Sequence, residues 1–253
     1  MTPLLELNAV SKQFGQNRVL DGVSLTVNPG EVIVILGPSG CGKSTLLRTL
    51  NGLDPIQGGE IRFDGERLDA STDWRRVRQR IGMVFQSYHL FPNLRVLENV
   101  LLGPLQVQKR DRQEALLQAE QLLTRVGLWE RRHDYPRQLS GGQQQRIAIV
   151  RALCMNPQVM LFDEVTAALD PEMVQEVLEV IRDLAGSGMT LLIVTHELAF
   201  ARAVADRIVF MEKGQILEQA VPHQFFDNPR SQRARQFLAK FSYTTVIKRK
   251  ESA

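Results

Sequence analysis

The chain has 253 residues, of which 43% are hydrophobic and 23% are charged, a balance that excludes a disordered chain and suits one large α/β domain. The formal net charge is +3, and Lys and Arg form no long run in the body of the chain, so charge alone predicts no nucleic-acid partner. No apolar run approaches the roughly 18 to 20 residues of a membrane-spanning helix, and we expect no signal peptide. Another chain must then supply any membrane span.

The N-terminal third predicts strands that lead into a glycine-rich loop. Residues 4–10 and 23–27 have the pattern of short strands, separated by a turn at 14–17. Residues 32–36 form a continuous apolar run rich in β-branched side chains, typical of a strand buried on both faces of a parallel sheet. The glycine-rich run follows directly, and residues 44–50 have the pattern of a helix.

This run, GPSGCGKS, matches the G-x-x-x-x-G-K-S pattern of a phosphate loop. Backbone N–H groups at a helix N-terminus hold phosphate anions, and glycines let the backbone approach them. We expect Lys43 to contact the β- and γ-phosphates and the Ser44 hydroxyl to bind Mg²⁺. The residues expected to bind nucleotide here are Gly37, Pro38, Ser39, Gly40, Cys41, Gly42, Lys43, Ser44 and Thr45.

The two cysteines are Cys41, inside the loop, and Cys154. Because the loop must approach a nucleotide, we expect no disulfide between them, which indicates a reducing compartment. A helix N-terminus lowers the pKa of a cysteine, so we also expect Cys41 to react readily with alkylating reagents.

The middle of the chain predicts a helical subdomain, at about residues 94–153, inserted into the α/β core. Residues 94–137 contain no strand of the buried type, and residues 113–126 repeat apolar side chains at helical spacing. A further helix is expected from Gly141 to Cys154, and free N–H groups at its start would attract a phosphate.

Candidate catalytic residues follow two later strands, predicted at residues 159–162 and 191–194. Asp163 comes directly after the first strand, where an enzyme with a phosphate loop holds Mg²⁺. Glu164 is expected to polarise the attacking water as general base. His196 follows the second strand, at the same sheet edge, and is expected to hold the water and Glu164 in line.

The remaining elements complete the prediction of fold class. A helix is expected to begin at Asp170 and Pro171, with Asp170 as its cap, and residues 207–218 read as a hairpin turning at Lys213-Gly214. The sequence thus predicts an α/β fold: a P-loop NTPase core with a mostly parallel sheet, an N-terminal antiparallel β subdomain and the inserted helical subdomain. The domain is expected to span residues 1–242, followed by a tail at 243–253.

Three runs, GPSGCGKST, LSGGQQQR and MLFDE, occur in this order with His196 beyond them. Together they resemble the ATP-binding subunits of ABC transporters, from about Leu4 to Phe241. The resemblance implies an ATPase that uses ATP and Mg²⁺. It further implies that Gln86, a metal ligand with Ser44 and Asp163, links the Mg²⁺ and water site to a transmembrane partner. Asp170 would lie at a dimer interface, and Phe14 would stack on adenine unless it is an ordinary core or turn aromatic.

The resemblance also implies a paired mechanism. Ser140, Gly141, Gly142 and Gln143 would contact the γ-phosphate of a nucleotide held by another copy, in a head-to-tail homodimer or ATPase pair that sandwiches two ATP molecules. Closure would drive two transmembrane permease subunits, with an extracytoplasmic solute-binding protein acting indirectly. We expect a peripheral protein on the cytoplasmic side of the cell membrane, and no nucleic-acid partner.

Residues 82–92 and 96–100 resemble more closely the bacterial importers of polar amino acids. Two alternatives stay open: an ABC ATPase that regulates a membrane complex, and a soluble ABC ATPase that acts on nucleic acid. The sequence departs from the family at Val165-Thr166-Ala167, where a proline and a threonine–serine pair are usual. We still expect hydrolysis, with an effect of this segment on its rate and on coupling between protomers.

Overall fold

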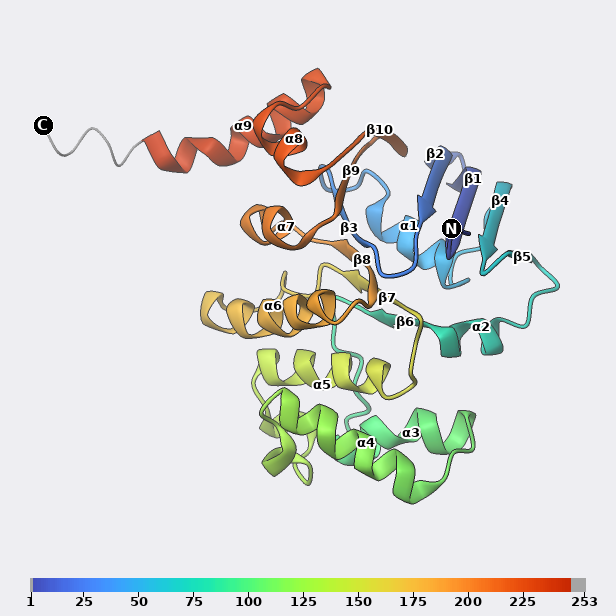
Figure 1. The fold of residues 1–253 in the computed structure, drawn as a ribbon, viewed down its shortest axis with the longest axis vertical. Helices are drawn as coiled ribbons and strands as arrows, with labels where there is room; N and C mark the ends of the chain where they lie inside the picture. The colour runs from blue at the N-terminus through green and yellow to red at the C-terminus, as the bar shows by residue number, and fades with distance from the viewer. Residues whose placement is uncertain (1, 247–253) are drawn as a thin grey trace, which may run out of the picture. The chain divides into compact units, whose positions relative to one another are not determined.

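The computed structural model describes the backbone of residues 2–246 (Figure 1). The chain divides into two compact units. The first contains residues 1–28, 32–70 and 197–253, and the second contains residues 29–31 and 71–196. Part of the tail expected from residue 243, residues 247–253, lies outside the described residues.

In the first unit, an antiparallel sheet has the strand order β2-β1-β4-β5. Its strands are β1 (Leu5–Phe14), β2 (Asn17–Val27), β4 (Gly58–Phe63) and β5 (Glu66–Leu68). β1 and β2 run up to the predicted turn and are therefore longer than expected. Their pairing shifts register between Leu7 and Gln13, and such bulges interrupt the strict alternation by which a strand is recognised in sequence.

The first unit also contains β3 (Val32–Leu36), β9 (Arg207–Glu212) and β10 (Gln215–Ala220). β3 is buried along its whole length and pairs parallel to β9, while β9 and β10 form the predicted hairpin. The described residues of this unit also form the helices α1 (Lys43–Leu50), α7 (Leu198–Val204), α8 (Pro222–Asp227) and α9 (Gln232–Val246). The ring of Phe210 on β9 packs against Phe225 of α8 and Phe237 of α9.

The second unit contains the parallel strands β6 (Ile81–Val84), β7 (Val159–Asp163) and β8 (Thr190–Val194), with β7 in the middle. Every residue of β7 and β8 is buried, as the continuous apolar runs predict. The helices α2 (Trp74–Arg80) and α6 (Pro171–Gly186) adjoin these strands in the chain. Because the three strands are parallel, their carboxyl ends meet at one edge.

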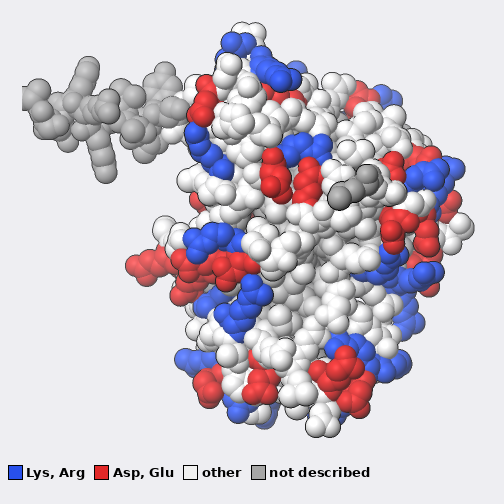
Figure 2. Space-filling view, in the orientation of Figure 1, with Lys and Arg blue, Asp and Glu red and all other residues white. Residues whose placement is uncertain are grey.

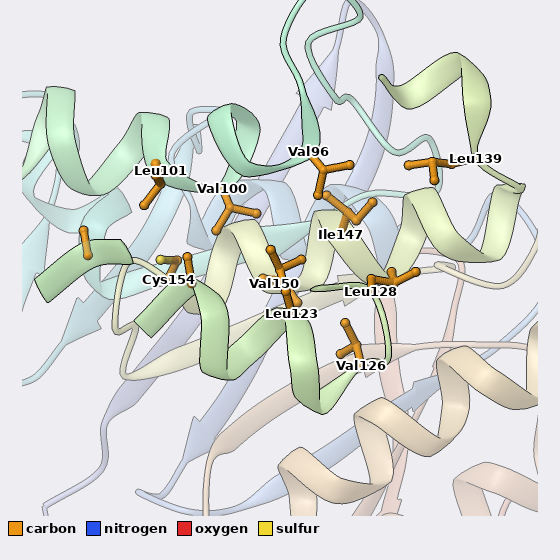
Figure 3. Packing of buried hydrophobic residues seen from close by; sticks show 12 residues of the cluster. Val96, Val100, Leu101, Leu123, Val126, Leu128, Leu139, Ile147, Val150 and Cys154 are labelled. Atoms are coloured by element: carbon orange, nitrogen blue, oxygen red, sulfur yellow. The ribbon is translucent and has the colours of Figure 1, made fainter. Parts of the chain in front are cut away.

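Between β6 and β7 the chain is helical. The elements are α3 (Val96–Leu102), the π-helix η1 (Gly103–Val107), α4 (Arg112–Arg125), the 3₁₀ turns η2 (Trp129–Arg131) and η3 (Pro136–Gln138), and α5 (Gly141–Leu153). Figure 3 shows their shared core, in which Val100, Leu123, Ile147 and Val150 are fully buried. This cluster fixes α5, whose N-terminus carries the LSGGQ run.

On the face shown in Figure 2, acidic and basic side chains are interspersed, as is typical of a solvated surface. Among the described residues, no helix combines the length and apolar character needed to cross a bilayer.

Candidate functional site

The phosphate loop lies in the first unit, between the buried strand β3 and helix α1. Gly37, Gly40 and Gly42 have φ angles of 153°, 75° and 104°, which L side chains rarely adopt. A Cβ on Gly42 would lie 2.6 Å from the carbonyl oxygen of Val19. At position 42, the backbone φ angle and the lack of room for a Cβ therefore both require glycine.

The ammonium group of Lys43 lies over this loop. Its Nζ donates hydrogen bonds to the carbonyl oxygens of Gly37 (3.0 Å) and Pro38 (3.1 Å), and the residue is 4% exposed. No acidic residue lies in the first turn of α1, so the N–H groups and helix dipole there keep their positive potential. This geometry is suited to the anion that the sequence predicts here.

The expectation that the pKa of Cys41 is lowered is contradicted. Cys41 is 5% exposed, and burial raises the pKa of its thiol, outweighing the lowering by the nearby charge of Lys43 and by backbone N–H groups. Both Cys41 and Cys154 are free thiols, as expected.

Phe14 ends β1 and is 49% exposed, so it is not a core aromatic. The Nζ atom of Lys12 lies 4.6 Å from the centroid of its ring.

In the second unit, the carboxyl ends of β7 and β8 bring two predicted catalytic residues together. Asp163 is the last residue of β7 and is 9% exposed. Glu164 follows it with a φ of 49°, unusual for a residue with a side chain. Its N–H donates to the carbonyl oxygen of Val194 at 2.9 Å, and its Oε1 lies 3.1 Å from Nε2 of His196. The left-handed conformation thus turns the Glu164 carboxylate toward His196, a local strain of the kind found at functional sites.

Gln86 is exposed two residues beyond β6, and α5 holds the backbone around it. The side chain of Gln145 donates to the carbonyl oxygen of Phe85 at 3.1 Å. The Arg151 guanidinium donates to the carbonyl oxygen of His89 at 2.6 Å and, more weakly, to that of Tyr88 at 3.4 Å. Burial lowers the pKa of Arg151. Residues 85–89 and α5 are therefore tied together.

The N-terminus of α5 is a formed cap. Ser140 accepts a hydrogen bond from the Gln143 N–H (3.2 Å), and the Gln143 side chain accepts one from the Ser140 N–H (3.0 Å). The N–H of Gly142 points at Sδ of Met173, 3.3 Å away. The N–H groups of Gly142 and Gln143 therefore have partners within the chain, and the expectation that they are free is wrong. A Cβ on Gly142 would lie 2.8 Å from Cβ of Met173, so only glycine fits against the first turn of α6. No acidic residue lies in the first turn of α5.

Asp170 occupies the N-cap position of α6, and Pro171 begins the helix as predicted. The side chain of Asp170 makes no capping hydrogen bond, however, so its expected capping role is wrong. The backbone carbonyl of Asp170 accepts the N–H groups of Met173 and Val174 instead, at 2.9 and 3.1 Å.

Several contacts made by the candidate site residues are not indicated by any pattern in the sequence. The sequence gives no sign that Met173 covers Gly142, that Arg151 holds residues 88–89, or that Lys12 lies on Phe14. Each joins residues distant along the chain or depends on local strand geometry. For the first two, only an observed covariation between the paired positions would have given a signal.

Comparison with known proteins supports the resemblance. The family model described as "ABC transporter" matches residues 20–167. The chain is 52% identical to the arginine transport ATP-binding protein ArtM of Bacillus subtilis, and 53% identical to the glutamate/aspartate import ATP-binding protein GltL of Escherichia coli K12. Each alignment covers 94% of this chain and 99% of the relative.

Solved structures agree with the fold. A dimeric post-hydrolysis state of the ATP-binding cassette MJ0796, bound to ADP and Pi, matches with a TM-score of 0.78 and 34% identity, over 86% of this chain and 98% of that one. CbiO1 of Clostridium perfringens, part of the transporter complex CbiONQ, matches with a TM-score of 0.81 and 28% identity, over 98% and 97%. The predicted fold class and ATPase activity are thereby confirmed: this chain belongs to the ABC transporter family, as one of its ATPases.

Proposed function

We propose that this chain is the ATP-hydrolysing subunit of an ABC importer that takes up an amino acid. The observation that carries hydrolysis is the Glu164–His196 contact at the carboxyl ends of β7 and β8, in a chain whose phosphate loop is complete. Uptake of an amino acid is supported by the relatives, since those at about half identity are named for arginine and for glutamate or aspartate.

The residues divide into roles by their chemistry. The phosphate loop, residues 37–45, binds the triphosphate. Ser44, Gln86 and Asp163 carry oxygen atoms of the kind Mg²⁺ prefers and would hold this ion together with the phosphates and water. When bound, Mg²⁺ neutralises charge on the phosphates.

Glu164 is the general base in this proposal. It accepts the proton of the attacking water, while the hydrogen bond from His196 fixes the orientation of its carboxylate. Phe14 stacks on adenine, for which its exposed ring is suited.

The chain acts as a pair in this proposal. Ser140, Gly141, Gly142 and Gln143 receive the γ-phosphate of a nucleotide held by a second copy, and Asp170 lies at the same interface. Support comes from the first turn of α5, which carries no acidic residue, and from the dimeric form of the MJ0796 cassette. Hydrolysis removes the phosphate that joins the two copies.

The partners follow from this arrangement. Two transmembrane permease subunits contact the exposed segment around Gln86, and a solute-binding protein delivers the amino acid from outside the cell. The chain is then peripheral, on the cytoplasmic side of the membrane. We assign residues 1–242 to the ATPase domain and about 94–153 to its helical subdomain.

The test is the variant Glu164→Gln, which removes the base and keeps the shape of the side chain. We expect hydrolysis to fall by about 100-fold or more, and the variant with ATP to elute as a dimer in size-exclusion chromatography. Glu130→Gln is the matched control, because the Glu130 side chain is 90% exposed in η2 and pairs only weakly with Arg132 at 3.7 Å. Unchanged hydrolysis in Glu164→Gln excludes Glu164 as base, and a monomer with ATP excludes the paired site.

A second experiment addresses transport. The chain is co-purified with its membrane partners, reconstituted in vesicles, and assayed for hydrolysis stimulated by the binding protein loaded with an amino acid. Stimulated hydrolysis with uptake supports the importer. Stimulation without uptake supports a regulatory ATPase, and a nuclease-sensitive association with RNA supports the third alternative.

A further inference from the structure

Lys12 is a buried cation that the roles described above do not use. It lies on β1 and is 5% exposed, although lysine is rarely buried without a partner. Its Nζ donates a hydrogen bond of 2.7 Å to the carbonyl oxygen of Pro55 and lies 4.6 Å from the centroid of the Phe14 ring. An ammonium at this distance from an aromatic centroid makes a cation–π interaction.

The segment that carries Pro55 is fixed against β1. The N–H of Gln57 donates to the carbonyl oxygen of Ser11 at 2.9 Å, and the Gln57 side chain accepts the N–H of Gln13 at 3.0 Å. These bonds flank Lys12 on both sides in the sequence. The ammonium is therefore held in one place, and it is not a mobile surface charge.

The two sides of the Phe14 ring differ as a result. Lys12 is almost fully buried, whereas Phe14 is 49% exposed. The ammonium thus covers the face of the ring that is turned toward the protein, and the opposite face remains open to solvent. One face of the ring is occupied by a cation, and the other is available for stacking.

We propose that Lys12 is a positioning residue for the nucleobase: it holds the Phe14 ring and polarises it, so that the open face stacks on the purine of the bound nucleotide. The face of an aromatic ring is electron-rich, and two such faces repel each other when they stack. A cation behind the ring draws electron density away from the open face and lowers this repulsion. The inference rests on the proposed binding of ATP and adds a determinant of base preference to it.

Lys12→Met removes the charge and keeps an unbranched side chain. We expect its dissociation constant for ATP to rise by up to about tenfold; the Lys12–Phe14 contact exists with and without ATP, so the energy of a cation–π contact is an upper bound for its effect on stacking. Binding of inorganic tripolyphosphate is expected to stay unchanged, because it has no base. The preference for ATP over CTP is expected to fall, since a pyrimidine offers less area for stacking.

The experiment is calorimetric titration of the full chain with ATP, CTP and tripolyphosphate. Lys12→Arg keeps a cation and is expected to retain the ratio of ATP to tripolyphosphate affinity. Lys12→Gln keeps a donor for the Pro55 carbonyl, and it takes the place of Lys12→Met if the latter folds poorly. Phe14→Leu, alone and with Lys12→Met, tests the dependence on the ring, and we expect no further loss in the double variant.

The outcomes separate this inference from the proposed function. If Phe14→Leu leaves ATP binding unchanged, the assignment of Phe14 to adenine fails, and the role of Lys12 fails with it. If Phe14→Leu weakens ATP binding and Lys12→Met does not, only the role of Lys12 fails. Equal weakening of ATP and tripolyphosphate by Lys12→Met, or an undiminished effect of Lys12→Met in the Phe14→Leu background, also overturns it.

Discussion

Asn99 offers a sharp test of how the segment after Gln86 is held in place. It is fully buried in α3, and its side chain makes four hydrogen bonds with the backbone of residues 91–95. Its Oδ1 accepts the N–H of Phe91 at 2.8 Å. Its Nδ2 donates to the carbonyl oxygens of Phe91, Leu94 and Arg95 at 3.2, 3.0 and 3.1 Å. The variant Asn99→Ala removes all four bonds.

The expected loss of stability follows from what happens to each group. The carbonyl of Phe91 keeps the Leu94 N–H, and the carbonyl of Arg95 keeps the N–H of residue 99. The N–H of Phe91 and the carbonyl of Leu94 lose the partner that Asn99 provided, at about 1–3 kcal/mol for each group that stays buried. Since exposed Phe91 can admit water, we expect a total near 3 kcal/mol, or a fall in Tm of roughly 6–12 °C.

The assay is thermal unfolding with nucleotide absent. Asn93→Ala is the matched control, because Asn93 is exposed in the same segment and its loss is expected to change stability by less than about 0.5 kcal/mol. Asn99→Asp keeps the acceptor for Phe91 but turns a carboxylate oxygen toward three carbonyls. It should be at least as unstable as Asn99→Ala at neutral pH. An Asn99→Ala variant as stable as Asn93→Ala, or an Asn99→Asp variant more stable than Asn99→Ala, refutes the reasoning.

Two further predictions concern the first turn of the phosphate loop and the buried thiol. Gly37→Ala should lose about 3 kcal/mol and most nucleotide binding, since its Cβ would collide with the backbone carbonyl of Met211. In Gly40→Ala the added Cβ meets no atom within 4 Å, so this variant should lose only the roughly 1–2 kcal/mol of stability that backbone strain costs. Equal unfolding midpoints for Gly37→Ala and Gly40→Ala would contradict this account. Burial raises the pKa of Cys154 to about 11, so the folded chain keeps a proton that the unfolded chain releases near pH 9. The free energy of unfolding should therefore fall between about pH 9 and pH 11. Measured by urea unfolding, this fall should be smaller in Cys154→Ala than in the unmodified chain. An equal fall in the two proteins would argue against Cys154 as the cause.

The sequence predicts best those strands that are buried on both faces. β3, β7 and β8 are buried on both faces, so their apolar runs identify them without knowledge of their neighbours. β6 has only four residues, one of them a glycine, and the helices α7 and α8 have only seven and six residues, so periodicity has too few residues to reveal them.

The candidate site likewise has features that the sequence predicts and features that it does not. The phosphate loop and the Glu164–His196 pair are predicted because each follows a strand whose end is recognisable. The direction of the pKa shift of Cys41 is predicted incorrectly, because the sequence shows its place before a helix but not the burial that governs its pKa. The contact of Met173 with Gly142 joins two helices across 31 residues, and no local pattern encodes it.

Helix α5 joins two functional segments of the chain through one rigid element. It has 13 residues, a rod of about 20 Å, and its core face is locked by Ile147 and Val150. Its first turn is the one proposed to contact the nucleotide of the neighbouring copy. Further along the helix, Gln145 and Arg151 form hydrogen bonds with the backbone on either side of Gln86. One helix therefore joins the turn proposed to meet the neighbouring copy's nucleotide to the backbone on either side of Gln86, with no chain of intermediate side chains between them.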